Sequence, residues 1–489
     1  MRAMLGYRFK RTTLWLFLFI GLLCGLGLAR TKLCPGPLIP VSLLPFMIIA
    51  LRKQALAGLM IVAIFGFSCG WWRGSEHARQ LQVYQSLYYQ KITITIRANE
   101  DAVYNKYKQL AFTAGNITLQ NGQSIKGKIQ LSGFGVNAVF QGDEIEATGK
   151  LYPGYSAYQG RMSFAVLKLK AHHPTVVSEI RRKFIAGTQS VLPDPLAPFV
   201  MGLLVGQRAT LPQDVKDDLR MVGLTHIIAV SGYNLTIILQ ASRRLLGNKS
   251  KRISTFLSLG LIGVFLLLAG ASASIVRAAI VSLLSILAAY YGRNFKSLNL
   301  ICLAAVITAW ANPVYIWSDL SWYLSFLAFF GVMVLAPLVQ ARWSWRWPKT
   351  VIGGVALESI CAEIMTLPFV LHIFGQMSRV GLVANVLVVT LIPFAMLLGV
   401  ISGLTGMLIG GLAGWITWPS VILLNYMLDT AHLLANLPNI FVEGIGLSLM
   451  QMLILYGCIG LLVFSLWRGS GKNAIITDMN EPKTRGLLA

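Results

Sequence analysis

Charged residues are scarce in this sequence, and acidic residues are the scarcest of them. Only 12% of the 489 residues are charged, whereas soluble domains carry about a quarter. This composition excludes an ordinary soluble globular protein. Apolar residues make up 55% of the chain, and they form runs of the ~18 or more residues that a membrane-spanning helix needs. The composition predicts a polytopic α-helical membrane protein.

Cysteine and histidine patterns that hold disulfides or metal ions are also missing. The six cysteines include no Cys-x-x-Cys pair, and only Cys34 lies outside an apolar stretch. The six histidines are dispersed along the chain except for the adjacent His172 and His173. We therefore expect no disulfide framework, no bound metal and no other cofactor.

The few charges are strongly unbalanced. Basic residues outnumber acidic ones by 42 to 18, which gives a formal net charge of +24. In a membrane protein this excess orients helices by the positive-inside rule and attracts anionic lipid. A protein that binds a polyanion such as nucleic acid has the same excess. Charge alone leaves both interpretations open.

The apolar runs predict about 12 membrane spans in two groups, with both termini in the cytoplasm. A segment of alternating apolar and polar residues separates the two groups of spans. The tail after the last apolar run is polar. The predicted order is N-terminal membrane helices at 1–75, an external β domain at 76–175, interfacial amphipathic helices at 176–221, a second membrane domain at 222–468 and a disordered cytoplasmic tail at 469–489.

Residues 91–170 alternate apolar and polar side chains, with a hairpin signal at Asn121 and Gly122. The pattern predicts a small external β-barrel of the OB-fold type. Ten basic and five acidic residues lie in this range, and basic barrels bind single strands by stacking bases on aromatic rings. A spacer or docking role is the alternative. The candidate nucleic-acid contacts are Lys106, Lys108, Lys126, Lys128, Arg161 and Tyr152.

Ionisable residues and a Ser-Gly break interrupt the apolar runs of the second membrane domain. An ionised side chain at the bilayer centre costs roughly 2.5–3.5 kcal/mol, so each needs a partner or a cavity. A broken helix at Ser231 and Gly232 is typical of a transport pathway. A packed His226 and a buried ion pair of Arg277 are the alternatives. The candidate pathway-lining residues are His226, Ser231, Gly232, Asn234, Arg277, Asp319 and Glu363.

Ser231 follows His226 by five residues, which invites comparison with a serine hydrolase. The segment lacks the Gly-x-Ser-x-Gly elbow and a suitably placed acid. We therefore expect no catalytic residue here and a protein that is not an enzyme.

Several motifs occur in an order that resembles the ComEC-type competence family. They include His226-Ile-Ile-Ala-Val-Ser-Gly232, Asp319-Leu-Ser321, Thr366-Leu-Pro368 and Phe374-Gly-Gln-x-Ser378. The resemblance implies a multi-pass channel of the bacterial inner membrane, with residues 222–468 as its competence domain and an external OB-fold. Such a channel passes single-stranded DNA into the cytoplasm during natural transformation.

Two departures from that family shape the expected partners. Asn234 stands where members often carry a second histidine, and no metallo-β-lactamase-like nuclease domain follows the last span. We therefore expect single-stranded DNA and membrane lipids as partners, together with a separate nuclease, a DNA-receptor protein and a cytoplasmic helicase or ATPase. A transporter of another polyanion or lipid-linked glycan, or a membrane scaffold that recruits a nuclease or motor, remains an alternative.

Overall fold

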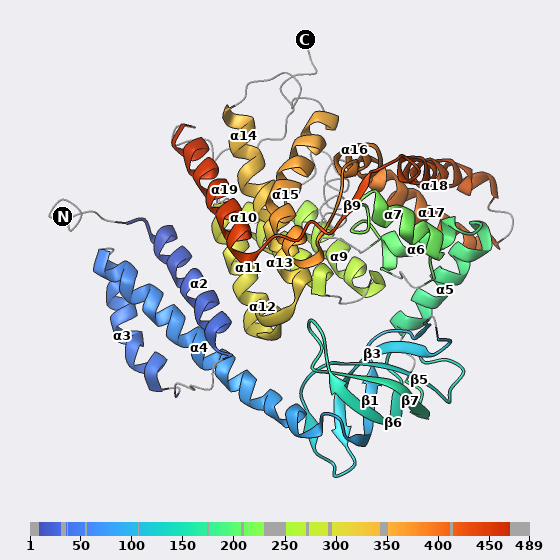
Figure 1. Ribbon diagram of the computed structural model, residues 1–489, viewed down its shortest axis with the longest axis horizontal. Helices are drawn as coiled ribbons and strands as arrows, with labels where there is room; N and C mark the ends of the chain where they lie inside the picture. Colours follow the sequence, from blue (N-terminus) through green and yellow to red (C-terminus); the bar gives the residue numbers. More distant parts are fainter. Residues whose placement is uncertain are drawn as a thin grey trace. The chain divides into compact units, whose positions relative to one another are not determined.

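Two compact units make up the computed structural model (Figure 1). Unit 1 comprises Met1–Glu179 and Cys302–Tyr323, and unit 2 comprises Ile180–Ile301 and Leu324–Ala489. Residues 302–323 thus join the N-terminal part of the chain, across the domain boundaries that the sequence predicts. The structure describes residues 9–30, 36, 38–53, 56–105, 107–173, 176–206, 210–228, 251–269, 273–291, 296–342, 351–410 and 414–469.

Three helices open unit 1: α2 (Arg11–Leu28), α3 (Leu38–Lys53) and α4 (Leu56–Leu87). Helices α2 and α4 pack backbone against backbone along a row of glycines. A Cβ on Gly25 would collide with the carbonyl oxygen of Phe67, and one on Gly70 with that of Leu22. Only glycine permits this approach, which increases the van der Waals contact between helices in lipid.

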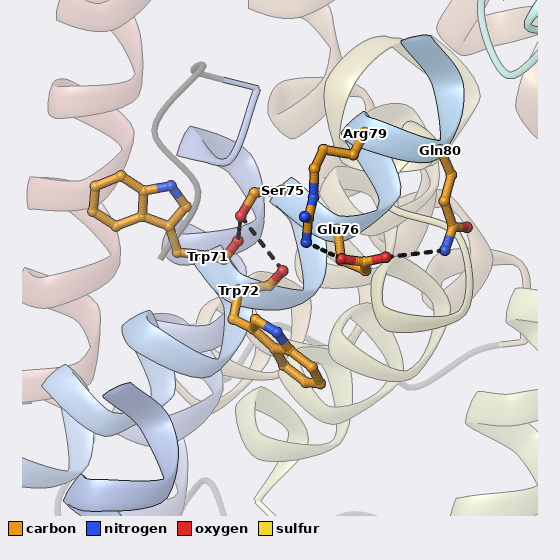
Figure 2. A network of polar contacts seen from close by, with 6 residues as sticks. All are labelled: Trp71, Trp72, Ser75, Glu76, Arg79 and Gln80. Carbon is orange, nitrogen blue, oxygen red and sulfur yellow. Dashed lines mark hydrogen bonds and ion pairs between the residues drawn. The ribbon is translucent and has the colours of Figure 1, made fainter. Parts of the chain in front are cut away.

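Helix α4 changes character near its middle, as Figure 2 shows. Apolar residues extend to Trp71 and Trp72, and the next turns carry charged and polar side chains. Glu76 accepts hydrogen bonds from Arg79 and, at 3.3 Å, from the Gln80 amide. Tryptophans followed by charges are typical of a membrane–water boundary, so α4 leaves the apolar layer here and continues to the β domain (Figure 1).

A seven-stranded sheet forms the β domain of unit 1. Strand β1 pairs with β6 and also with β3, and the intervening pairings run β6–β7, β7–β5 and β5–β3. Strands β2 and β4 pair only with β3, so the sheet as a whole is not the closed barrel that the sequence predicts. The strands are β1 (Lys91–Ala98), β2 (Val103–Tyr104), β3 (Leu110–Leu119), β4 (Ser124–Ile125), β5 (Ile129–Phe134), β6 (Glu144–Pro153) and β7 (Gly160–Ala171).

The end of α4 is built into the core of this β domain. Tyr84 is only 2% exposed and packs in one cluster with strand residues such as Ile94 and Leu151. Its hydroxyl donates a 3.2 Å hydrogen bond to the carbonyl oxygen of Lys126. The alternating buried and exposed residues of the strands supply the rest of the core, as the period of two predicts.

Residues 302–323 add a corner to unit 1. It comprises the end of α11 (Ser297–Ala311), the short α12 (Val314–Ser318) and the first turn of α13 (Leu320–Phe330). The indole of Trp317 donates a 2.8 Å hydrogen bond to the carbonyl oxygen of Leu26, at the end of α2.

Unit 2 is mainly helical. Helix α6 is buried along its whole length. Strands β8 and β9 form a small antiparallel sheet. The other elements, some shared with unit 1, are α5 (Val176–Val191), α6 (Leu196–Val205), α7 (Gln213–Met221), α9 (Lys251–Ala269), α10 (Ala273–Tyr290), η1 (Gly331–Leu335), α14 (Ala336–Arg342), α15 (Val351–Phe374), β8 (Gln376–Ser378), α16 (Gly381–Val388), η3 (Val389–Leu391), α17 (Ile392–Ile409), α18 (Gly414–Ala435), β9 (Phe441–Glu443) and α19 (Leu449–Gly469).

Six helices among the described residues are long and apolar enough to cross a membrane. They lie at Arg11–Leu28, Leu56–Leu87, Leu320–Arg342, Ala356–Phe374, Gly381–Ile409 and Leu449–Arg468. Their number establishes a polytopic helical membrane protein. The expectation of about 12 spans stays a prediction. Length alone does not decide whether the shorter apolar helices cross a membrane, and residues 229–250 lie outside the described residues.

Candidate functional site

The most distinctive surface of the β domain is a set of tyrosine rings with two cationic side chains. The guanidinium of Arg161 lies 4.7 Å from the ring centroid of Tyr155 and 5.8 Å from that of Tyr152. The ammonium group of Lys150 lies 5.7 Å from the Tyr152 ring. Tyr89 completes the set, with its ring edge-on to Tyr152 at 5.8 Å. We call Tyr89, Lys150, Tyr152, Tyr155 and Arg161 the aromatic–cation patch.

The strand register brings the patch together. Tyr152 of β6 stands opposite Arg161 of β7, where side chains of an antiparallel pair are direct neighbours. Lys150 precedes Tyr152 by two residues and so shares its face of the strand. Tyr155 is 66% exposed and Tyr89 63% exposed, so their rings offer free faces to a ligand. The patch combines stacking surfaces with positive charge.

Two other predicted contacts, Lys126 and Lys128, lie in the segment between β4 and β5. The backbone carbonyl of Lys128 accepts a hydrogen bond from the backbone N–H of Gln159, and the Tyr88 hydroxyl donates to the carbonyl of Gln159 at 2.6 Å. The side chains of Lys126 and Lys128 are exposed. Lys108 is exposed in the turn before β3, and Lys106 lies outside the described residues. The sequence prediction missed Tyr89, Lys150 and Tyr155, although the spacing of Lys150 and Tyr152 indicates a shared face.

In unit 2, three segments far apart in sequence meet around two glycines. A Cβ on Gly223, just after α7, would lie 3.4 Å from the Cβ of Ser378 in β8. A Cβ on Gly381, which opens α16, would lie 3.6 Å from Oε1 of Glu363 in α15. His226 joins them through a 3.2 Å hydrogen bond between its Nδ1 and the carbonyl of Gly223. We call His226, Glu363, Ser378 and Asn385 the polar cluster.

Two members of the polar cluster hold buried polar atoms that lack partners. Within the described part of the chain, neither Oγ of Ser378 nor Oδ1 of Asn385 has a hydrogen-bond partner. Asn385 stands four residues after Gly381 on α16, hence on the same helix face. A buried polar atom without a partner costs about 1–3 kcal/mol.

The remaining pathway candidates fall in different places. Arg277 of α10 is 1% exposed, and its neighbours Ile275 and Ala278 belong to the same core cluster as Ile227 and Ile228. Asp319 belongs to unit 1, where its carboxylate contacts the hydroxyl of Ser156. Ser231, Gly232 and Asn234 lie outside the described residues. The structure thus places His226 and Glu363 on segments that meet around Gly223 and Gly381, and Ser378 and Asn385, which the sequence prediction did not name as site residues, lie on the same segments.

Helix α7, which leads into Gly223, is held by polar contacts at both sides. Asp218 Oδ2 lies 2.7 Å from Nδ1 of His432 in α18. Arg220 donates a 2.7 Å hydrogen bond to Oε1 of Gln376 and lies 3.6 Å from a carboxylate oxygen of Glu443. The hydrogen bond to Asp218 and its negative charge raise the pKa of His432 above its ordinary value of 6.5. These contacts fix the segment that positions His226.

Comparison with known proteins places the larger part of the chain in a family. A family model described as competence protein matches residues 203–469, more than half of the chain. ComE operon protein 3 of Bacillus subtilis (strain 168) is 27% identical over 230 residues, which are 46% of this chain and 29% of that relative. The chain therefore spans less than a third of that relative's length in the match. No solved structure matches the chain.

Proposed function

The chain belongs to the competence protein family, and we propose that it passes single-stranded DNA through the bacterial inner membrane into the cytoplasm. The aromatic–cation patch is the observation that carries the proposal. Its tyrosine rings offer stacking surfaces for bases of any sequence, and its two cations attract the phosphate backbone. A protein that takes up DNA of any sequence needs this kind of contact.

We place the β domain on the outer side of the membrane, with both chain termini in the cytoplasm. The basic clusters of the sequence support this orientation through the positive-inside rule. In that arrangement the patch meets the entering strand before the membrane helices do. The Trp71–Trp72 boundary of α4 is then the outer surface of the apolar layer.

We assign the polar cluster to the lining of the passage. Ser378 and Asn385 contribute polar atoms, and Glu363 contributes a carboxylate close to Gly381, at the start of the helix that carries Asn385. A lining of this kind keeps water in the passage without binding phosphate tightly, since conduction needs contacts that a strand can leave. His226, positioned by Gly223, contributes a further polar ring.

We further propose that the protein transports the strand without catalysing a covalent step. The sequence around Ser231 supports this, because it differs from the Gly-x-Ser-x-Gly elbow of serine hydrolases. Degradation of a second strand and the driving force then come from a separate nuclease and a cytoplasmic helicase or ATPase. A DNA-receptor protein would deliver the strand to the patch.

Uptake of labelled DNA by a gene-deleted competent strain, complemented with variants, tests the proposal. We expect uptake to disappear on deletion, to return with the wild-type gene, and to return only weakly with Tyr155→Ala. Tyr104→Ala is the matched control, because Tyr104 is another exposed tyrosine of the β domain outside the patch. Normal DNA uptake in the deletion strain would overturn the proposal, and loss of glycan export there would favour a glycan transporter.

A further inference from the structure

The loop between β6 and β7 carries the aromatic–cation patch and also reaches the corner at α12 and α13. Tyr155 of this loop stacks on Arg161. The next residue, Ser156, has a φ of 54°, a left-handed conformation that turns its peptide away from the strand direction. Its side chain and its carbonyl both contact residues more than 160 positions later in the chain.

Ser156 is tied to the corner in both directions. Its hydroxyl donates a 3.3 Å hydrogen bond to Oδ1 of Asp319, and its carbonyl oxygen accepts one from the hydroxyl of Ser318. Asp319 is only 3% exposed. The 3.3 Å bond is longer than the usual O–H···O distance of about 2.5–3.0 Å, so it joins the loop to the corner together with the bond from Ser318 and not by itself.

The same carboxylate oxygen of Asp319 caps a membrane helix. Oδ1 accepts hydrogen bonds from the backbone N–H of Ser321 at 3.0 Å and from its hydroxyl at 2.8 Å. This is the geometry of an N-cap, and a negative charge also suits the positive end of the helix dipole. Helix α13 opens the candidate span Leu320–Arg342. One oxygen atom therefore holds both the patch-bearing loop and the first turn of a span.

A half-buried tyrosine of the same loop, Tyr158, lies near two carboxylates. Tyr158, two residues after Ser156, has a raised pKa because burial, then the charges of Glu100 and Asp319, disfavour its ionised form. Its hydroxyl therefore stays neutral near both carboxylates. Tyr155 of the patch is thus adjacent in the chain to Ser156, which contacts the α13 cap residue Asp319.

We propose that Asp319 and Ser156 form a coupling contact that transmits occupancy of the aromatic–cation patch to the first turn of α13. This inference rests on the proposed function, since it assigns a role to Asp319 in passing a bound strand onward. Asp319 is a positioning residue here: it touches the loop and the helix, not the strand. The loop and the helix cap share one acceptor, Oδ1 of Asp319. Because of this, a movement of the loop changes the free energy of the cap's hydrogen bonds, and a movement of the cap changes that of the loop.

The test uses full-length protein in lipid nanodiscs for DNA binding and complemented cells for DNA uptake. Ser156→Gly removes the hydroxyl while tolerating the positive φ, and Ser156→Asn tolerates it and restores a donor. We expect Ser156→Gly to bind a labelled oligothymidylate within about twofold of wild type and to lower uptake about fivefold, as loss of one ordinary hydrogen bond predicts. Ser156→Asn should recover most of that uptake. Tyr155→Ala should instead weaken binding itself.

The outcomes separate the coupling from the proposed function. Wild-type uptake by Ser156→Gly overturns the coupling and leaves the proposed function standing. A loss of affinity that matches the loss of uptake also overturns it, because Ser156 would then be part of the binding surface. A Ser156→Asn variant as poor as Ser156→Gly, with both proteins folded, points to a structural role and overturns it as well. Absence of uptake and of binding in the wild type would remove both proposals together.

Discussion

The guanidinium of Arg161 lies 4.7 Å from the ring centroid of Tyr155 and 5.8 Å from that of Tyr152. One planar cation therefore holds two tyrosine rings of the patch in fixed positions. Guanidinium groups stack on aromatic faces in a way that an ammonium group does not. Arg161 thus has two separable properties, a positive charge and a stacking plane.

Replacing Arg161 separates those properties. We expect Arg161→Lys to weaken binding of single-stranded DNA by about fivefold or more, because loss of ordered stacking costs about 1–3 kcal/mol per base. The dependence of the binding constant on salt should not change. Arg161→Ala should weaken binding further and lower the salt slope by about one, since one phosphate contact is lost. Fluorescence anisotropy over a range of salt concentrations measures both quantities. Equal affinity of Arg161→Lys and wild type would contradict the stacking role.

The patch also shows how far sequence reasoning reaches. Composition and period predict the helices and the strands of the β domain, because both follow from local hydrophobic patterns. The same reasoning names Arg161 and Tyr152 as candidate nucleic-acid contacts. They do not predict that the two residues stand opposite each other, since the register of β6 and β7 depends on the whole sheet.

Longer-range contacts were beyond the sequence altogether. Asp319 is grouped from sequence with His226 and Glu363, yet it belongs to unit 1 and bonds to Ser156. No local pattern links residues 163 positions apart. The meeting of Ser378 with Gly223 is of the same kind, because it depends on how β8 and α16 fold back onto the end of α7.

The carboxylate of Glu363 should matter for transport and not for strand capture. We expect Glu363→Gln to lower DNA uptake about fivefold or more while the affinity of the patch stays the same, because ionisable groups within the membrane serve the passage. Glu358→Gln is the matched control. Glu358 lies five residues earlier on α15, so it points away from Glu363 on the helix. DNA uptake by cells and fluorescence anisotropy of DNA binding, measured on the same two variants, separate transport from capture. If Glu363→Gln took up DNA as well as the control Glu358→Gln does, Glu363 would not belong to the passage.

The contact of Asp218 with His432 should make the attachment of α7 depend on pH. The pKa of His432 is raised above 6.5 in the folded protein by its bond to Asp218. Its stabilising contribution is therefore fully present below 6.5 and is lost as the pH rises through the raised pKa. We expect Asp218→Asn to lower the unfolding temperature at a pH of about 6 and to have little effect at about 9.

A neighbouring carboxylate provides the control for this prediction. Asp217 accepts a 3.0 Å hydrogen bond from Gln213 within α7 and does not contact His432. Asp217→Asn should therefore change the unfolding temperature equally at both pH values. Thermal unfolding of the purified protein in detergent, followed by circular dichroism, measures all three proteins. A pH-independent effect of Asp218→Asn would show that the charge of His432 does not contribute.

The backbone contact between α2 and α4 gives the sharpest prediction for stability. A methyl group on Gly25 would collide with the carbonyl oxygen of Phe67, whereas one on Gly27 would lie 3.8 Å from the nearest atom, Cδ1 of Ile316. Both residues lie inside α2, where alanine is intrinsically about 1 kcal/mol more favourable than glycine. Helix propensity therefore predicts stabilisation by both substitutions, and packing predicts the opposite sign for one of them. We expect Gly27→Ala to leave the unfolding temperature unchanged or raised and Gly25→Ala to lower it, since overpacking costs about 1–3 kcal/mol. If both variants were equally stable, α2 and α4 would not pack through their backbones, because no rearrangement of side chains relieves a clash with a carbonyl oxygen.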